Sequence, residues 1–179
     1  WQDGSIGERT ADHFYPISIV ERDVILEKCR EIQPDAVASI GSDLAMLTVN
    51  YVAGKLGLPC NSMECTEIST NKYAMRKAFQ AAGVPVPGFY EADAEATAAD
   101  LGGLKLPVIV KPTDRSGSRG ITKVEEWGQL PEALQASVDN SFEKKAIVEE
   151  YLTGPEYSCE CVSCRGKHHF LAVTKKYTT

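Results

Sequence analysis

Apolar runs alternate with helical patterns along the first sixty residues of the chain. Residues 15–20 and 36–40 have the short apolar runs of buried strands. Between them, residues 21–33 carry apolar side chains at helical spacing, and a second helical pattern begins at Asp43. Short links between strand and helix predict parallel strand pairing, and therefore an α/β layer. Ser42 and Asp43 are interpreted either as a plain helix N-cap or as ligand groups at the end of a strand.

A proline-bearing link divides this part from a second unit that mixes helices and strands. A helix is predicted over residues 72–82 after the capping residues 69–71, and Pro85 and Pro87 prevent its continuation. The elements predicted beyond the link are a strand at 88–91, a helix at 93–101, strands at 108–110 and 121–124, a helix from 130 to 138, a strand from 146, and an antiparallel pair at 157–162 and 168–177.

The stretch from residue 106 to 124 carries the clearest chemical signal. An apolar strand leads to Lys111, and a loop of small and polar residues follows at 114–120 before a second β-type run. Its glycines let the backbone turn sharply, so that backbone N–H groups can approach an anion closely. The lysine adds a positive charge beside them. We therefore expect a phosphate-binding site built on a hairpin.

Composition and charge exclude several classes of partner. The chain has 179 residues, of which 43% are hydrophobic and 25% charged, as in ordinary globular proteins. Its net charge of −6 argues against a nucleic acid or an anionic membrane as the main partner. No apolar run approaches the roughly 18 residues of a membrane-spanning helix. Any basic cluster is therefore expected to be a local site.

The ends and the cysteines suggest a context for the chain. It begins at Trp1 without a methionine and stops directly after a strand-like run, so we expect a fragment that lacks material at both ends. Six cysteines without a signal peptide indicate the cytoplasm, with reduced thiols. Cys159 and Cys161 are expected to share one strand face and to pack as small apolar side chains. A zinc site that includes Cys164 is the alternative, but its spacing is atypical.

Three phrases in order point to a family. Each is weak alone, because a lysine at the end of a strand is commonly exposed and paired glutamates commonly face solvent. Together, STNKYAMRKAF (69–79), PVIVKPTDRSGSRGITKV (107–124) and AIVEEYLTGPEYS (146–158) resemble the ATP-grasp superfamily. Within it, the chain looks most similar to relatives of carbamoyl-phosphate synthase large subunits and to amino-acid ligases. The last phrase is also similar to D-alanine–D-alanine ligase.

This resemblance covers residues 58–177 and implies a fold. It implies the α/β (α+β) class, with an ATP-grasp fold that follows a partial Rossmann-like α/β domain. The expected divisions are a partial preceding domain at 1–68, a linking helix at 69–86, the ATP-grasp lid subdomain at 87–152, and the start of a truncated C-terminal subdomain at 153–179.

The resemblance also implies a nucleotide site. Lys72 and Lys111 would approach the phosphates and the ring edge, while the backbone of Ser116, Gly117, Ser118, Arg119 and Gly120 would cover the β- and γ-phosphates. Glu149, with the main chain of Glu150, Tyr151 and Leu152, would hold the adenine edge, and Glu156 would accept both ribose hydroxyls. Lys176 is a further candidate for phosphate, with Lys175 as its competitor.

The implied cofactors are ATP and Mg²⁺. The family's metal ligands lie on later strands, so neither a metal ligand nor a catalytic residue is assigned here. The implied reaction is ligation of a carboxylate and an amine through an acylphosphate, with the small-molecule substrate unidentified. Activation of bicarbonate, as in carbamoyl-phosphate synthase, stays open, and so does a homodimer. The alternative is a non-catalytic nucleotide-binding or sensing module.

Overall fold

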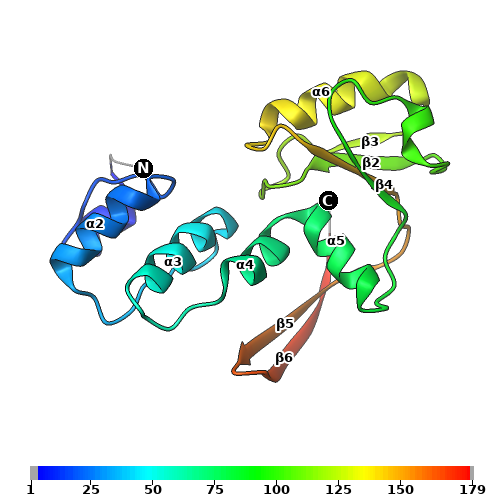
Figure 1. The fold of residues 1–179 in the computed structure, drawn as a ribbon. Coiled ribbons are helices and arrows are strands. Elements are labelled where there is room, and N and C mark those ends of the chain that lie inside the picture. The colour runs from blue at the N-terminus through cyan, green and yellow to red at the C-terminus, as the bar shows by residue number, and fades with distance from the viewer. Residues whose placement is uncertain (1–3, 178–179) are drawn as a thin grey trace.

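The computed structural model describes residues 4–177 of the chain (Figure 1). The N-terminal part is helical and leads as a row of short helices toward a sheet. These helices are α1 (Ile6–Thr10), α2 (Arg22–Ile32), α3 (Asp43–Lys55), α4 (Met63–Thr70) and α5 (Lys72–Ala81). None of the helices in this described part is long and apolar enough to cross a bilayer.

The two strands predicted in the N-terminal part are wrong. Residues 15–20 and 36–40 pair with no other strand among residues 4–177. Val20 is 56% exposed and Ile40 is 99% exposed, so neither lies in a sheet core. Apolar runs of this length fit a strand only where a neighbour supplies the ladder hydrogen bonds. All strand pairs in the described part are antiparallel, and the expected parallel layer is absent from it.

Side-chain caps determine where these helices begin. The Ser42 hydroxyl accepts a hydrogen bond from the amide of Ala45 at 3.3 Å, which confirms the N-cap interpretation of Ser42. The Asn71 side chain accepts from the first amides of α5 and starts the predicted helix. Sequence reasoning missed α4, whose Ser and Thr residues have modest helix propensity. Its signal was Ser62, whose hydroxyl accepts from the amide of Cys65.

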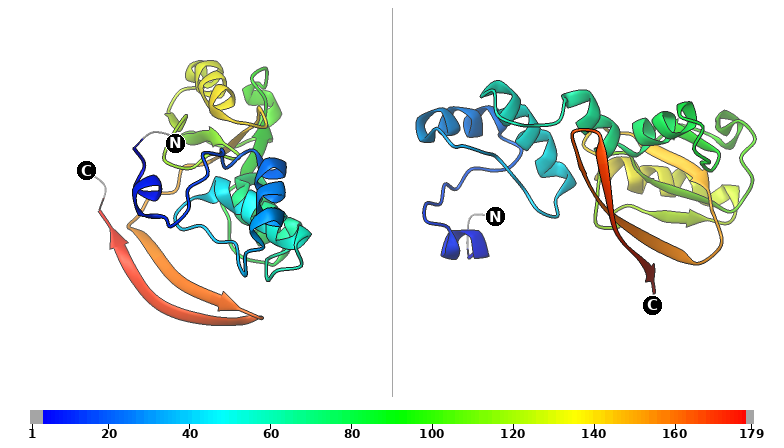
Figure 2. Two further views of the ribbon diagram at one scale, coloured as in Figure 1. Left: turned by 90° about the vertical axis from the view of Figure 1, so that its left-hand side faces the viewer. Right: turned by 90° about the horizontal axis from the view of Figure 1, so that it is seen from below.

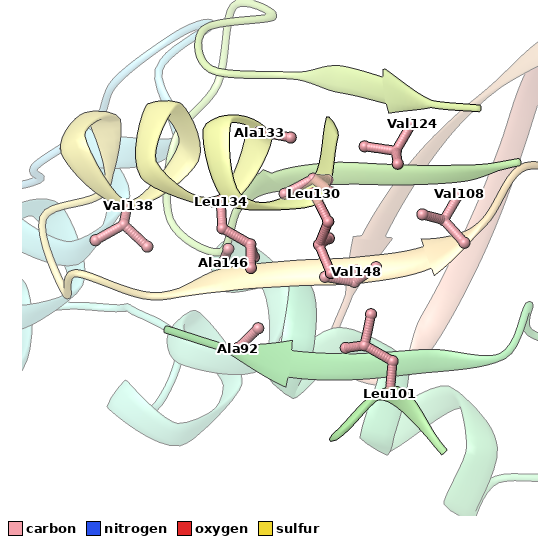
Figure 3. Packing of buried hydrophobic residues seen from close by; sticks show 11 residues of the cluster. Ala92, Leu101, Val108, Val124, Leu130, Ala133, Leu134, Val138, Ala146 and Val148 are labelled. Carbon is pink, nitrogen blue, oxygen red and sulfur yellow. The ribbon is translucent and has the colours of Figure 1, made fainter. Parts of the chain in front are cut away.

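The central sheet follows the predicted strands closely. It contains β1 (Phe89–Ala92), β4 (Ala146–Glu150), β2 (Val108–Pro112) and β3 (Thr122–Val124), in that spatial order. One helix, α6 (Leu130–Asn140), packs against β2, β3 and β4. In Figure 3, Leu130, Leu134 and Val138 of α6 lie over the valines and alanines of the strands. This cluster is the hydrophobic core of the second unit.

The helix predicted over residues 93–101 is reduced to a 3₁₀ turn at Ala98–Leu101. Asp93 forms a turn first, because its side chain accepts from the amide of Glu95. Thr97 and Asp100 then form a capping box at the start of the short helix, which ends at Gly102 with φ of 54°. The N-terminal capping box and the left-handed Gly102 leave only four residues between the two caps, too few for a full α-helix.

Alternation along β2 divides its side chains between two faces of the sheet. Val108 and Val110 are fully buried toward α6. Ile109 and Lys111 point to the opposite face, where the chain runs past α5 toward the last hairpin. The sheet therefore has one packed face and one face available for a ligand.

The last two strands, β5 (Glu156–Cys164) and β6 (Lys167–Lys176), form a long antiparallel hairpin that extends away from the central sheet (Figure 2). Cys159 and Cys161 share one face, as predicted, with their Sγ atoms 3.7 Å apart. Both are exposed, so the expected packing as apolar side chains is wrong for the described residues. Residues 4–177 contain no group of three or more candidate metal ligands, so the zinc alternative has no support there.

Candidate functional site

A cleft of about 650 Å³ opens beside the uncovered face of β2 and β4. It is bounded by α5, by the segment that follows β4, and by the two ends of the β5–β6 hairpin. The residues that line it are Arg76, Pro87, Ile109, Lys111, Glu149, Glu150, Tyr151, Leu152, Gly154, Pro155, Glu156, Lys176 and Tyr177. Seven of the thirteen residues predicted from the sequence therefore line this one cleft.

Strand register brings Lys111 and Glu149 together. Ile109 lies directly opposite Glu149 in the antiparallel pair of β2 and β4. Residues 109 and 111 share a face, so Lys111 and Glu149 are diagonal neighbours on it. The ammonium of Lys111 donates to Oε1 of Glu149 and forms an ion pair. The Glu149 side chain is only 5% exposed, so this pair lies at the floor of the cleft.

Arg76 completes the arrangement, and sequence reasoning missed it. Its Nε donates to Oε2 of Glu149 at 2.7 Å, and its Nη2 donates to Oε1 at 3.3 Å. Arg76 follows the predicted Lys72 by four residues, one helical turn along α5. The spacing of four residues places Arg76 on the same face of α5 as Lys72. This spacing was the sequence signal that could have predicted Arg76 as a site residue.

The three charges control the protonation of Glu149. Burial pushes the pKa of its carboxyl upward, but hydrogen bonds from Arg76 and Lys111 outweigh burial. The pKa of Glu149 is therefore lowered overall, and the carboxylate stays charged at neutral pH. Both of its oxygens are engaged by side chains within the protein, so the carboxylate is a support for the site.

The main chain after β4 provides hydrogen-bonding groups at the cleft. The Glu150 amide donates to the carbonyl of Gly88 at 3.0 Å, and the Tyr151 amide donates to the carbonyl of Pro107 at 3.2 Å. Within the described part of the chain, the Leu152 amide has no such partner. Of the three main-chain positions predicted here, Leu152 thus has its donor available to a ligand.

Glu156 and Lys176 lie opposite each other at the open end of the hairpin. They are paired in register, and the ammonium of Lys176 is 3.1 Å from Oε1 of Glu156. Both line the cleft and both are exposed, so a ligand can reach either of them. The Lys175 ammonium instead lies 5.2 Å from the ring centre of Tyr177, and Lys175 is absent from the cleft wall. Of the two lysines that the sequence offered as phosphate contacts, Lys176 therefore lines the cleft and Lys175 does not.

Lys72 does not line this cleft. Its ammonium donates to the carbonyl of Arg115, at the start of the glycine-rich loop. Burial, and secondarily the like charge of Lys111, lower the pKa of Lys72. Lys72 thus connects α5 to the loop and lies near enough to Lys111 to affect its charge environment.

The glycine-rich loop also lies away from the large cleft. Ser116, Gly117 and Arg119 line a separate cavity of about 190 Å³, together with Ser42 at the start of α3. Ser118 and Gly120 belong to the same loop and line neither space. The structure therefore gathers Lys111, residues 149–152, Glu156 and Lys176 in one cleft and leaves Lys72 and residues 116–120 outside it.

Gly120 shows why this loop needs glycine. Its φ is 64°, in the left-handed region that side chains disfavour. A Cβ there would lie 3.0 Å from both the carbonyl oxygen of Ala136 and Cβ of Asn140. The end of the loop is therefore held close against α6, and this close approach anchors the hairpin to the core.

Known proteins share this architecture. Residues 69–179 match the family described as the ATP-grasp domain. The D-alanine–D-alanine ligase of Gloeobacter violaceus is 33% identical over 107 residues, covering 56% of this chain and 35% of that protein.

Solved structures resemble the fold. The L-amino acid ligase from Bacillus licheniformis superimposes with a TM-score of 0.73 at 24% identity, over 92% of this chain and 42% of that one. The D-alanine–D-alanine ligase from Helicobacter pylori has a TM-score of 0.61 at 21% identity, over 70% and 39% of the two chains. The chain thus spans well under half the length of these proteins. Because the family match covers residues 69–179, the chain belongs to the ATP-grasp family.

Proposed function

We propose that this chain is the nucleotide-binding part of an ATP-dependent ligase that joins a carboxylate to an amine through an acylphosphate. The observation that carries the proposal is the single cleft lined by Lys111, Glu156, Lys176 and the main chain at Leu152. These are two cations for phosphate, a carboxylate for hydroxyls and a free amide for a base, in a chain of the ATP-grasp family. The names of its ligase relatives support the reaction class.

The proposal assigns each group a part of ATP. Lys111 and Lys176 bind the phosphates as point charges, and Glu156 accepts hydrogen bonds from the ribose hydroxyls. The Leu152 amide donates to the adenine edge. Glu149 supports Lys111, because its carboxylate is already bonded to Arg76 and Lys111. Residues 87–152 act as the lid subdomain, and residues from 153 begin the C-terminal subdomain.

The remaining predicted residues have a part that depends on movement. Residues 116–120 would cover the β- and γ-phosphates only after the loop shifts toward the cleft. Lys72 would move with it, since its ammonium is bonded to the Arg115 carbonyl. The exposed positions 116–119 make few contacts that oppose such a shift.

Magnesium is not assigned to side chains of this chain. Residues 4–177 contain no group of three or more candidate metal ligands, and we propose that the protein ligands of Mg²⁺ lie outside this chain. The contribution of the described residues is binding and orientation of the nucleotide.

The six free cysteines accord with a reducing compartment such as the cytoplasm.

Phosphate release tests the ligase assignment. The full-length protein is incubated with ATP and Mg²⁺ and with a panel of amino acids, amines and bicarbonate. We expect release of phosphate that depends on an amino acid and an amine, and its loss in Lys111→Ala. Release stimulated by bicarbonate would favour activation of the carbamoyl-phosphate synthase kind. Nucleotide binding without any turnover would instead favour the non-catalytic sensing module.

A further inference from the structure

Arg76 and Lys111 share one buried carboxylate, and they do so unequally. Arg76 reaches both oxygens of Glu149, at 2.7 Å to Oε2 and 3.3 Å to Oε1. Lys111 contacts Oε1 alone. If Lys111 leaves, both oxygens of Glu149 keep a donor from Arg76. If Arg76 is absent, Lys111 is the one cation among residues 4–177 that forms an ion pair with this carboxylate.

This inequality matters because Glu149 is buried. Its side chain is 5% exposed, whereas those of Arg76 and Lys111 are 25% and 18% exposed. A buried carboxylate that loses its partners is strongly disfavoured. A planar guanidinium with two donors can keep such a carboxylate paired, while an ammonium supplies a point charge without fixed geometry. Arg76 is therefore suited to be the fixed partner of Glu149, and Lys111 is suited to be a partner that can leave.

We infer that Arg76 is a positioning residue that keeps Glu149 paired while Lys111 transfers its contact from Glu149 to a phosphate group of the nucleotide. This inference rests on the proposed function, because the phosphate belongs to the ligand proposed for the cleft. The group of three carries a net charge of +1, so one positive charge is available to an anion. Arg76 acts through Glu149 and Lys111 and need not touch the ligand.

If Arg76 acts through Lys111, its substitution should weaken the binding of a nucleotide that carries phosphate more than the binding of a nucleoside. In Arg76→Met, Lys111 has to stay on Glu149, so affinity for ADP should fall about tenfold while affinity for adenosine changes less than twofold. Arg76→Lys should recover part of the loss. Lys77→Met is the matched control, because Lys77 is the next residue of α5 and lies outside the cleft wall. It should leave both affinities unchanged.

A second substitution separates this role from simple packing. Glu149→Gln removes the charge that retains Lys111, so Arg76→Met with Glu149→Gln should bind ADP within about twofold of the unsubstituted protein. In folded Glu149→Gln, the affinity for ADP relative to that for adenosine should not fall, which keeps the test valid if Arg76→Met folds poorly. In a Lys111→Met background, Arg76→Met should have no further effect on ADP.

Titration calorimetry with adenosine and ADP measures all of these affinities. Phosphate-dependent loss in Arg76→Met, with recovery in the double variant, supports the inference. Normal binding of ADP by folded Arg76→Met, or equal loss of ADP and adenosine that the double variant fails to recover, overturns it and leaves the nucleotide site standing. If the unsubstituted protein binds neither ligand, the proposed function and this inference both fail.

Discussion

At the scale of single residues, one buried glutamate organises the candidate site. Glu149 faces the cleft because Ile109 is its register partner and Lys111 is two residues further along the same face. Lys111 and Glu149 were both predicted from their motifs, but their pairing follows from the register, which no local pattern specifies. Arg76 was missed for the same reason. Its contact joins residues 73 positions apart in the sequence.

The lowered pKa of Glu149 leads to a pH dependence of stability. A carboxyl whose pKa is depressed by folding contributes stability above its unfolded pKa of about 4.3, and this contribution is lost as pH falls through the folded pKa. We expect Glu149→Gln to lower the free energy of unfolding at pH 7 by about 2–4 kcal/mol, because Arg76 and Lys111 lose their common partner.

Urea denaturation of both proteins from pH 7 to pH 3 measures this difference. The gap should stay constant down to about pH 5 and should narrow below about pH 4, where the Glu149 carboxyl of the unfolded chain takes up a proton before that of the folded protein. A gap that is unchanged at pH 3 would mean that the substitution acts through packing and that the ion pairs contribute little.

At the scale of elements, the sequence predicted those that carry their own local signals. The β2–β3 hairpin was predicted from its apolar runs and glycine-rich loop, and helices α5 and α6 from apolar periodicity that agrees with the Asn71 cap of α5 and the proline at the start of α6. Residues 15–20 and 36–40 failed because an apolar run becomes a strand only beside a partner strand. The glycine-rich loop does follow β2 as predicted, but its position outside the cleft accompanies the close approach of Gly120 to α6, which no local pattern specifies.

Two glycines of the loop should differ in how well they tolerate alanine. Gly117 and Gly120 both have positive φ, at 74° and 64°, so alanine strains the backbone at either position by about 1 kcal/mol. A Cβ at Gly117 meets nothing within 4 Å, whereas one at Gly120 meets α6 at 3.0 Å. We expect Gly120→Ala to lower the free energy of unfolding by about 1 kcal/mol more than Gly117→Ala, as measured by chemical denaturation. Equal losses would show that α6 yields to the added methyl group.

The loop should also respond to nucleotide. Its residues 116–119 are exposed and make few contacts, so their amides should exchange with deuterium faster than those of β2 in the free protein. Adding ATP should slow exchange at 116–120 if the loop moves over the phosphates. Hydrogen exchange followed by mass spectrometry measures this change, with the β5–β6 turn as an internal control. Protection of β2 and β4 without protection of the loop would place the nucleotide in the cleft and exclude loop closure.

At the scale of the whole molecule, family membership was predictable and the arrangement of the site was predictable in part. Three motifs in order led to the ATP-grasp resemblance, and the match over residues 69–179 confirms it. The motifs on β2, on β4 and at the start of β5 line one cleft, which brings Lys111 and Glu156 to the same site. Lys72 was expected there as well, but its side chain turns to the Arg115 carbonyl, and that choice is made by tertiary contacts.

The central claim is that the cleft beside β2 and β4 binds ATP through Lys111. Calorimetric titration of this chain with a non-hydrolysable ATP analogue tests it most directly, alongside Lys111→Ala and Lys105→Ala. Lys105 is an exposed lysine that precedes the same strand and lies outside the cleft wall. We expect saturable binding with one site per chain, a loss of at least tenfold in affinity in Lys111→Ala, and no change in Lys105→Ala. Absence of binding at millimolar nucleotide, or equal effects of the two substitutions, would contradict the claim.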